Sequence, residues 1–359
     1  MVDARMLGHS GIGTYLRGLL REYEKAPFFQ ECSLGLALPP SLFSQVGGSL
    51  KLFAFDAPVY SMKEQAMYPF QLKKSRLWHA SHYNIPLLKQ GARLIVTVHD
   101  LIHWIFRKEF YSPLQSLYAQ IFFKKVTQLA DRIIAVSHQT RDDLIQFFGA
   151  SPEKIRVIYE GVTPEFFEPW SEEEKRKLIQ KYQLPDRFFL YVGLLKPHKN
   201  VKFLAEVFLK LRKEGRIHSD LVIVGKKDQK FPLPTGEGLH CLSQVGSRKE
   251  LAGFYASARA LVHPSFYEGF GLTCLEAMAS GAPVIVSRVA SLPEVVGEAG
   301  YYVDPYSEES LRQAILELEE NDTLCRELSE KGKLRARQFN WPKAAKETIE
   351  VYKEVLSLS

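Results

Sequence analysis

The sequence of 359 residues predicts an α/β protein with two domains, each built on a parallel sheet that helices cover on both faces. Short apolar runs rich in Val and Ile alternate with longer amphipathic segments, which is typical of parallel sheets. The alternation stops in the proline-rich, charged residues 162–177 and then restarts, and this stretch is interpreted as a connection between domains. The chain length also suits two domains, and its 46% apolar content can bury cores of ordinary size.

The first half opens with a short strand at residues 1–2, followed by a glycine-containing turn and a helix. Strands are expected at 93–100, 131–137 and 155–161, because these runs are continuously apolar. Helices are expected at 112–130 and 138–149, and Gly149 is the predicted stop of the second.

The second half repeats the pattern. Strands are expected at 188–193, 221–225, 259–265 and 283–287, with helices at 200–214, at 248–257 and from 272 onward. Residues 226–239 predict an irregular loop, and residues 308–357 predict helices. Because ligands of open parallel sheets bind beyond the carboxyl ends of the strands, functional residues are expected there.

Composition points to a cytoplasmic protein. No run of about 18 apolar residues is present, and the start lacks the order of a signal peptide. The four cysteines are scattered without a CxxC pair, which fits reduced thiols better than disulfides or a zinc site.

The net charge of +6 is unevenly distributed. Residues 1–160 contain 19 Lys and Arg against 13 Asp and Glu, whereas the rest of the chain is balanced. Such an excess favours an anionic partner of the first half, such as a membrane surface, a phosphorylated acceptor or nucleic acid. A mildly basic solvated surface is the alternative explanation.

The most informative stretch is "SFYEGFGLTCLEAMASGAPVIVS", residues 265–287. Gly269 and Gly271 allow a ligand to approach the backbone, and the helix expected from Leu272 offers free N–H groups to an anion. Glu268 and Glu276 can accept hydrogen bonds from hydroxyls on either side of that anion. The constellation predicts a site for a sugar joined through a diphosphate to a ribose; a capped helix with acidic residues near its start is the alternative.

These residues resemble the Glu-x7-Glu signature of retaining family 4 glycosyltransferases with the GT-B fold, a family that includes many mannosyltransferases. Residues 2–20, 97–104, 190–201 and 339–356 resemble other segments of the same family. The resemblance implies two facing Rossmann-like, doubly wound domains with a deep cleft, and a C-terminal helix that crosses back to the first domain. The implied acceptor domain is 1–163 completed by 341–359, and the implied donor domain is 164–340. Relatives usually have more residues before the first strand, so this strand is short here or the chain starts upstream.

The resemblance also implies site residues. Glu276 would bind the ribose, and Lys199 and Thr273 the diphosphate. The sugar would contact Glu268 and the backbone of Gly269, Phe270, Gly271 and Leu272. In the first domain, Gly11 and Gly13 would contact donor or acceptor, and His99 would contact the transferred sugar and help to position the reaction.

Three neighbouring positions complete the expectations for the site. Asp100 is expected to orient a loop or a ring. Leu194 stands where many relatives carry an Arg, so a second cationic contact from Lys196 or His198 is an open alternative. Arg248 and Lys249 would border the base or merely begin an exposed helix. His263 is expected in the core.

The implied activity is metal-independent, retaining hexosyl transfer from a nucleotide sugar, best GDP-mannose, to a glycan or lipid-linked acceptor. A lysine and a helix start can hold a diphosphate, and no Asp-x-Asp occurs in the chain. Catalysis is expected from stabilisation of the leaving diphosphate, with front-face attack. UDP- or dTDP-sugar donors, a sugar-nucleotide epimerase and a catalytically inactive nucleotide- or membrane-binding module are the alternatives.

The first domain is also expected to dock peripherally on an anionic membrane surface, and no nucleic-acid partner is expected. Basic clusters at 72–76, 106–110 and 123–126 lie among aromatic residues, a mixture suited to lipid head groups and the bilayer interface. The aromatic residues considered are Trp78, Trp104, Phe106, Phe110 and Tyr111; their burial in a core is the alternative.

Overall fold

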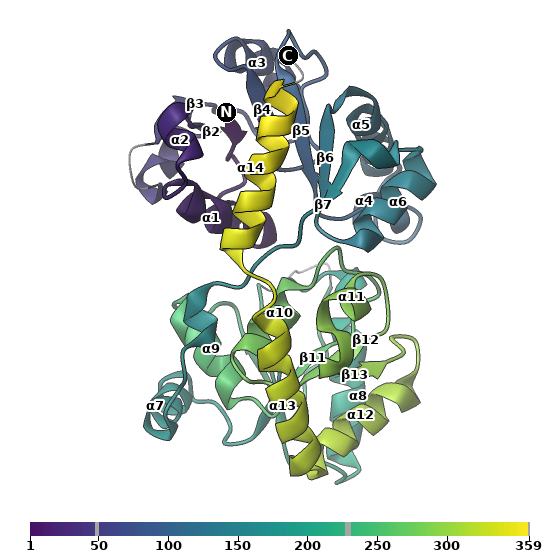
Figure 1. Cartoon of the computed structure of the whole chain (residues 1–359). Coiled ribbons are helices and arrows are strands. Elements are labelled where there is room, and N and C mark those ends of the chain that lie inside the picture. Colours follow the sequence, from purple (N-terminus) through teal and green to yellow (C-terminus); the bar gives the residue numbers. More distant parts are fainter. Residues whose placement is uncertain (47–49, 227–230, 358–359) are drawn as a thin grey trace. The chain divides into compact units, whose positions relative to one another are not determined.

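Two parallel sheets organise the chain in a computed structural model that describes residues 1–46, 50–226 and 231–357 (Figure 1). The chain divides into two units around these sheets. Unit 1 combines Met1–Gly161 with Asn340–Ser359, and unit 2 is Val162–Phe339. The implied boundaries at 163 and 341 lie close to these divisions.

Unit 1 contains a seven-stranded sheet in the order β3-β2-β1-β4-β5-β6-β7, with every pair parallel. Its strands are β1 Val2–Asp3, β2 Gly35–Leu38, β3 Lys51–Ala54, β4 Leu77–Ala80, β5 Arg93–Val98, β6 Arg132–Ala135 and β7 Ile155–Val157. Its α-helices are α1 Gly11–Tyr23, α2 Phe28–Glu31, α3 Met62–Leu72, α4 Ile102–Ile105, α5 Pro113–Leu129, α6 His138–Phe148 and α14 Trp341–Ser357.

Unit 2 contains a six-stranded parallel sheet in the order β10-β9-β8-β11-β12-β13. Its strands are β8 Phe188–Val192, β9 Asp220–Val224, β10 Leu239–Leu242, β11 Leu261–His263, β12 Val284–Ser287 and β13 Gly300–Val303. Its α-helices are α7 Glu172–Tyr182, α8 Val201–Lys213, α9 Arg248–Ser257, α10 Leu272–Ala279, α11 Leu292–Val296, α12 Glu308–Glu320 and α13 Asp322–Ala336. Short 3-10 turns join several of these elements, including η4 Pro197–Lys199.

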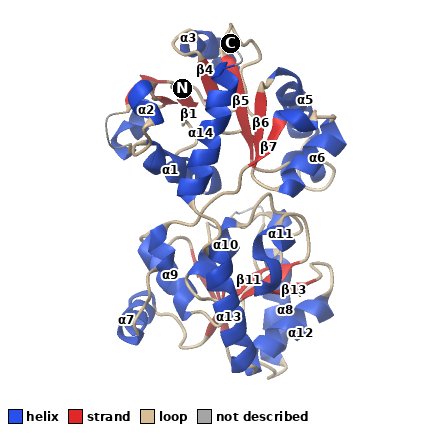
Figure 2. Cartoon of the chain, viewed as in Figure 1, coloured by secondary structure: helices blue, strands red, loops and turns tan. Residues whose placement is uncertain are grey.

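Local sequence signals explain the helix ends that were predicted. The Ser112 hydroxyl and the Gln115 side chain form a capping box at the start of α5, with Pro113 as its first residue. Ser137 caps α6, and Gly149 ends it at a φ of 62° that glycine adopts without strain. The predictions for 112–130 and 138–149 are therefore confirmed, and Figure 2 shows both helices beside β6 and β7.

The interpretation of residues 162–177 as a connection is wrong for its second part. Residues from Glu172 onward begin α7, because Ser171 and Glu174 form a second capping box there. Leu178 is the buried residue of this helix, which packs against α9. The run of charges is the exposed face of a short amphipathic helix.

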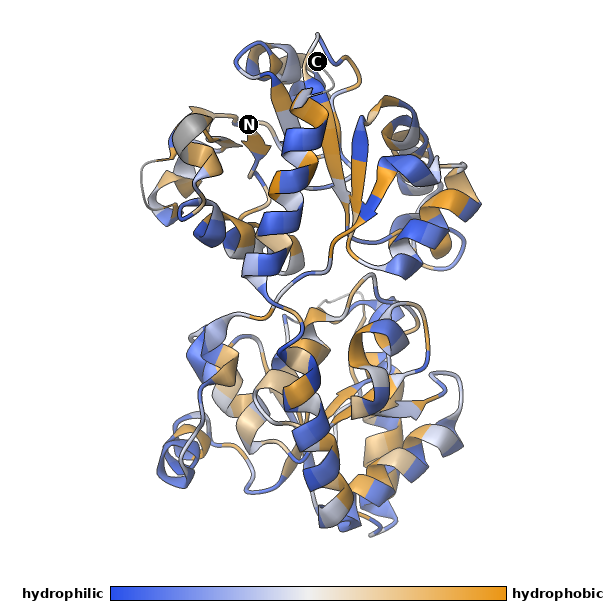
Figure 3. Cartoon of the chain, viewed as in Figure 1, coloured by the Kyte–Doolittle hydropathy of each residue, from blue (hydrophilic) through white to orange (hydrophobic). Residues whose placement is uncertain are grey.

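The cores lie on the sheet faces, and Figure 3 shows hydrophobic residues concentrated on the central strands. In unit 1, α14 packs against α1, where Gly18 leaves room for the Trp341 ring. The hydroxyls of Tyr23 and Tyr352 join the same two helices by a hydrogen bond of 3.0 Å. The last helix of the chain therefore completes the first unit, as the resemblance implied.

The structure also bears on the expectations for the cysteines and for membrane-spanning helices. All four cysteines are free thiols. In the part of the chain that the structure describes, no helix is both long and apolar enough to cross a membrane.

Candidate donor site

In both sheets the chain adds strands first in one direction and then, from the fourth strand, in the other. We call the place where the direction changes the reversal point; in unit 2 it lies between β8 and β11. The chain leaves β8 and β11 at the same edge of the sheet, because the strands are parallel neighbours. Lys199 follows β8 at the end of η4, and Glu268 follows β11. Their side chains meet, with Nζ of Lys199 2.6 Å from each carboxylate oxygen of Glu268.

The loop after Glu268 leads directly into α10. Gly271 precedes the helix at a φ of 109°, a conformation that side-chain-bearing residues rarely adopt. The first N–H groups of an α-helix have no acceptor within the helix, so the start of α10 presents donors suited to an anion. Thr273 lies in this first turn and is half-buried.

Ser291 fixes the shape of this loop from the opposite side. Its buried hydroxyl lies 2.8 Å from the carbonyl oxygen of Glu268 and 3.0 Å from that of Phe270. Phe270 is also buried, and its ring contacts Phe339 edge-on. Sequence reasoning missed Ser291, since a serine 23 residues away gives no local signal.

His263 belongs to the same cluster. It ends β11, is 1% exposed, and its Nε2 atom lies 2.7 Å from Oε1 of Glu268. His263 is buried, as expected from the sequence. Its ring also contacts Glu268, a residue predicted for the site. The signal that could have found it is its place at a strand end, five residues before the glutamate.

The side chain of Glu268 is 9% exposed, and its carboxyl group carries a charge in this setting. Burial by itself raises its pKa, but the Lys199 ammonium and the His263 ring outweigh burial and hold the pKa well below its usual range. An ionised carboxylate beside a lysine and a helix start can bind a ligand that combines hydroxyls with an anion.

Glu276 lies one turn into α10 and is half-buried. The buried Tyr255 hydroxyl donates a hydrogen bond of 3.4 Å to its Oε2 atom. Both residues come from helices that pack together, α9 and α10. The carboxylate therefore has a fixed neighbour on one side and access to solvent on the other.

The positions around Lys199 differ in accessibility. Leu194 and Lys196 are exposed, whereas His198 is buried. Arg248 and Lys249 are the first two residues of α9. This agrees with the alternative in which they begin a helix.

In unit 1, His99 follows β5 and is held on both sides of its ring. Its Nε2–H donates to the carbonyl oxygen of Ser81 at 3.0 Å, and Nδ1 lies 2.9 Å from Oε1 of the buried Glu160. Asp100 accepts the backbone N–H of Ile102, which matches the expectation that it orients a loop. Sequence reasoning missed Glu160, which is 61 residues away from His99 in the chain.

Gly11 and Gly13 lie in the first turn of α1 rather than in an open loop. A Cβ atom at Gly13 would come within 2.4 Å of the Leu7 carbonyl oxygen, so this position requires glycine. A Cβ atom at Gly11 would meet nothing within 4 Å. The packing in unit 1 therefore explains the second glycine and leaves the first without a structural requirement.

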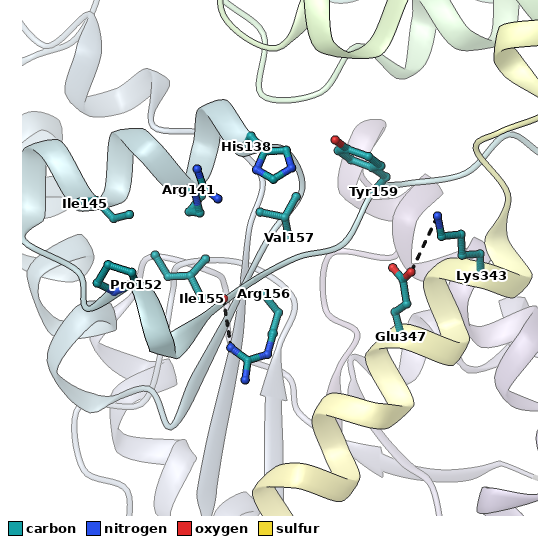
Figure 4. Close-up of a pocket in the computed structure, with 10 residues that line it drawn as sticks. All are labelled: His138, Arg141, Ile145, Pro152, Ile155, Arg156, Val157, Tyr159, Lys343 and Glu347. Carbon is teal, nitrogen blue, oxygen red and sulfur yellow. Dashed lines mark hydrogen bonds and ion pairs between the residues drawn. The ribbon is translucent and has the colours of Figure 1, made fainter.

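A cavity of about 540 Å³ lies elsewhere in unit 1, between α6, β7 and α14 (Figure 4). Its cations already have acidic neighbours: Arg141 pairs with Asp142, and Lys343 with Glu347. None of the residues predicted for the site lines this cavity.

Solved structures with the same architecture identify the fold class. Sucrose-phosphate synthase from Thermosynechococcus elongatus has a TM-score of 0.79 at 20% identity, covering 98% of this chain and 94% of that one. WaaG, a glycosyltransferase involved in lipopolysaccharide biosynthesis, has a TM-score of 0.76 at 17% identity, covering 95% of this chain and 96% of that one. Both structures therefore place the two parallel-sheet units of this chain in the GT-B fold.

Sequence comparison identifies the family. The model described as Glycosyltransferase Family 4 matches residues 35–166, and that described as Glycosyl transferases group 1 matches residues 172–335. O-antigen chain mannosyltransferase B of Escherichia coli is 32% identical, over 78% of this chain and 74% of that protein. O-antigen chain mannosyltransferase RfbU of Salmonella typhimurium is 30% identical, over 89% and 91%. The chain belongs to glycosyltransferase family 4, as the Glu-x7-Glu motif predicted.

Proposed function

We propose that this glycosyltransferase moves a mannosyl residue from GDP-mannose to a glycan or lipid-linked acceptor, with retention of configuration and without a divalent metal. Mannose is supported by two relatives that are named O-antigen chain mannosyltransferases. UDP- and dTDP-sugars are the competing donors.

The observation that carries the proposal is the contact between Lys199 and Glu268 at the start of α10. In the proposed complex the Lys199 ammonium, the Thr273 hydroxyl and the α10 N–H groups bind the diphosphate. Glu268 and the backbone of residues 269–272 bind the sugar, and Glu276 accepts hydrogen bonds from the ribose hydroxyls. Gly11, Gly13 and His99 are the proposed contributions of unit 1, with Ser81 and Glu160 fixing the His99 ring.

The proposed reaction breaks the bond between the anomeric carbon and the diphosphate oxygen. Negative charge then develops on the leaving GDP, where Lys199 and the helix start stabilise it more strongly than in the ground state. The acceptor hydroxyl forms the new bond on the same face of an oxocarbenium-like sugar, and its proton passes to the departing phosphate oxygen. The cationic groups of the chain take the place that a metal ion has in other glycosyltransferases.

Unit 1 also offers a surface for a membrane, which we define as the outer α5 face: Leu114, Leu117, Ile121, Lys124 and Lys125. These side chains are exposed and follow the helical period, and Leu114 is 77% exposed. In the proposal the leucines and the isoleucine enter the interface of an anionic leaflet while the lysines bind its head groups. Such docking would be peripheral, at the cytoplasmic membrane face.

This surface replaces the aromatic contacts expected from the sequence. Trp78 is fully buried, so its assignment to the membrane interface is wrong. Trp104 packs against the core of unit 1, and the rings of Phe106 and Phe110 stack on each other. Aromatic rings between a sheet and its covering helices bury a large apolar area, which favours core positions over solvent.

A binding and turnover experiment tests the function. GDP-mannose at 100 times its Kd should stabilise the protein by about 2.7 kcal/mol, and UDP-glucose or dTDP-glucose at equal concentration by less. With a mannose-terminated oligosaccharide as acceptor, the enzyme should release GDP and form an α-linked product. Both should still be observed in excess chelator. A preference for UDP- or dTDP-sugars would overturn the donor, and loss of activity on chelation with rescue by magnesium would overturn metal independence.

Two further outcomes would replace the proposed reaction. Conversion of the sugar nucleotide without any acceptor would indicate an epimerase. Nucleotide binding without turnover on any of a panel of mannose-terminated acceptors would indicate a binding module.

A further inference from the structure

The His263 ring occupies a rigid position beneath the donor site. Its ring stacks on that of Tyr191 with a centroid distance of 6.2 Å and an interplanar angle of 10°. Tyr191 lies in β8, next to β11 in the sheet, and is fully buried. A short side chain between two central strands has little freedom to move, in contrast to a lysine on a surface turn.

The proton on this ring can be assigned from its partners. Because Glu268 is ionised, its oxygens only accept hydrogen bonds, so Nε2 of His263 must carry the proton of the 2.7 Å contact. Nδ1 is buried and has no hydrogen-bond partner among the described residues. The ring is therefore oriented by one hydrogen bond, in which its Nε2–H points at Glu268.

Lys199 is the other partner of this carboxylate, and the proposed function gives it a second task. Its ammonium contacts both oxygens of Glu268 at 2.6 Å, yet the diphosphate of a donor would attract the same ammonium. The Lys199 side chain is 20% exposed and has four flexible carbons, so it can turn toward a phosphate. In residues 1–46, 50–226 and 231–357, His263 is then the remaining side-chain partner of the Glu268 carboxylate.

We propose that His263 is a positioning residue, which holds Glu268 in its sugar-binding orientation after Lys199 has turned to the diphosphate. The inference rests on the proposed function of Glu268 and extends it to a residue with no expected contact to the donor. A buried carboxylate that loses its cationic neighbour needs a fixed donor to keep its orientation. Rigid His263 supplies orientation, and mobile Lys199 supplies charge.

His263→Phe tests the proposal, because it keeps an aromatic ring on Tyr191 and removes the N–H. Loss of a hydrogen bond to a charged group should lower kcat/KM for GDP-mannose about 10- to 100-fold. The Kd for GDP should change less than about twofold, because GDP lacks the sugar that Glu268 binds. His263→Asn restores a side-chain N–H and should recover part of the loss.

His240→Phe is the matched control. His240 also pairs with a carboxylate, at 2.8 Å from Asp220, but it lies on the edge strand β10 and its side chain is 40% exposed. This variant should keep the wild-type kcat/KM. Equal activity of the His263→Phe and His240→Phe variants would overturn the inference, and so would an equal loss of GDP and GDP-mannose binding.

Glu268→Gln separates the inference from the proposed function. If this variant keeps full activity, the role of Glu268 in the proposed function fails. If it is inactive while His263→Phe is normal, only the positioning role fails. Should His263→Phe not fold, His263→Leu combined with Glu268→Gln in a double-mutant cycle decides: non-additive effects on kcat/KM support positioning, and additive effects overturn it.

Discussion

The two units share one strand order but place different cations at the reversal point of their sheets. In unit 1 this point lies between β1 and β4, and Arg5 follows β1. Its guanidinium bonds to Asp3, Glu64 and Tyr68 and lies 4.1 Å from the Phe55 ring centroid. In unit 2 the corresponding cation is Lys199, which contacts one carboxylate and stays partly exposed.

The difference shows how one topology supports either structure or binding. The Arg5 side chain is 3% exposed, and its planar group satisfies several partners at once, so it stabilises the unit and is closed to a ligand. Lysine is a mobile point charge, and its contact with the one carboxylate of Glu268 can be exchanged for a phosphate. The choice of cation, and not the strand order, distinguishes the closed reversal point of unit 1 from that of unit 2, whose cation stays partly exposed.

Arg5→Met should give the largest effect on stability. It leaves Asp3 and Glu64 buried without their cation, and breaking a buried ion pair in this way costs about 3–5 kcal/mol. Urea unfolding followed by circular dichroism measures this loss. A cost below about 1 kcal/mol would mean that Arg5 is no more structural than Lys199.

Lys199→Met should give the complementary result. Because His263 still bonds to Glu268, its cost in stability should be smaller than that of Arg5→Met. Its kcat/KM should fall about 10²- to 10³-fold, the usual effect of removing one group that stabilises developing charge. Steady-state kinetics with GDP-mannose checks this, and near-normal turnover would remove Lys199 from the proposed diphosphate site.

Glu276→Ala should weaken nucleotide binding by about 1–3 kcal/mol, because the ribose hydroxyls lose a charged acceptor. Calorimetry with GDP measures the change. Glu327→Ala is the control, since this glutamate is an exposed residue of α13 in the same unit. Identical GDP affinity of both variants would contradict the ribose assignment.

The outer α5 face should make unit 1, and not unit 2, the membrane-binding unit. Changing both Lys124 and Lys125 to Glu should reduce binding to anionic vesicles by roughly 2 kcal/mol or more, at about 1 kcal/mol for each basic residue near the leaflet. Co-sedimentation with phosphatidylglycerol vesicles measures it, with Lys202 and Lys213 of α8 changed to Glu as the control. Absence of wild-type binding, or equal loss in both double variants, would reject this surface.

The smallest expected effect concerns the pH dependence of stability. The contributions of the buried residues Glu268 and Glu64 to the unfolding free energy should change in opposite directions with pH. The pKa of Glu268 is lowered, since Lys199 and His263 outweigh burial, whereas burial raises the pKa of Glu64 despite Arg5. The stability from Glu268 is complete above the unfolded pKa of about 4.3 and is lost as the pH falls. Glu64 takes up its proton first in the folded state, so its contribution improves as the pH falls.

Gln variants isolate these two contributions. The difference in unfolding free energy between wild type and Glu268→Gln should shrink by about 1 kcal/mol from pH 5 to pH 3.5. The corresponding difference for Glu64→Gln should move the other way. If both differences in unfolding free energy changed with pH in the same direction, the electrostatic distinction between Glu268 and Glu64 would be contradicted.

The candidate site could be predicted only as separate parts. Lys199, Glu268 and Glu276 were found because each stands beside a strand end or a helix start with a recognisable local pattern. Ser291 and Glu160 were not assigned to the site, because nothing in the neighbouring sequence distinguishes them from core or loop residues, and His263 was assigned to the core although it ends a strand five residues before Glu268. Their roles depend on contacts that span up to 61 residues of chain, such as the one between Glu160 and His99.

The sequence by itself determined the two-unit α/β plan, the capped helices α5 and α6, and the Glu-x7-Glu motif, because these depend on residues within one or two turns of each other. Tertiary structure decided which short segments became strands, including β2 and β4, where burial outweighs a weak local pattern. It also decided the contact between Lys199 and Glu268, which lie 69 residues apart. Strand order brings their two turns to one sheet edge, and alternation along the chain does not encode which strands become neighbours.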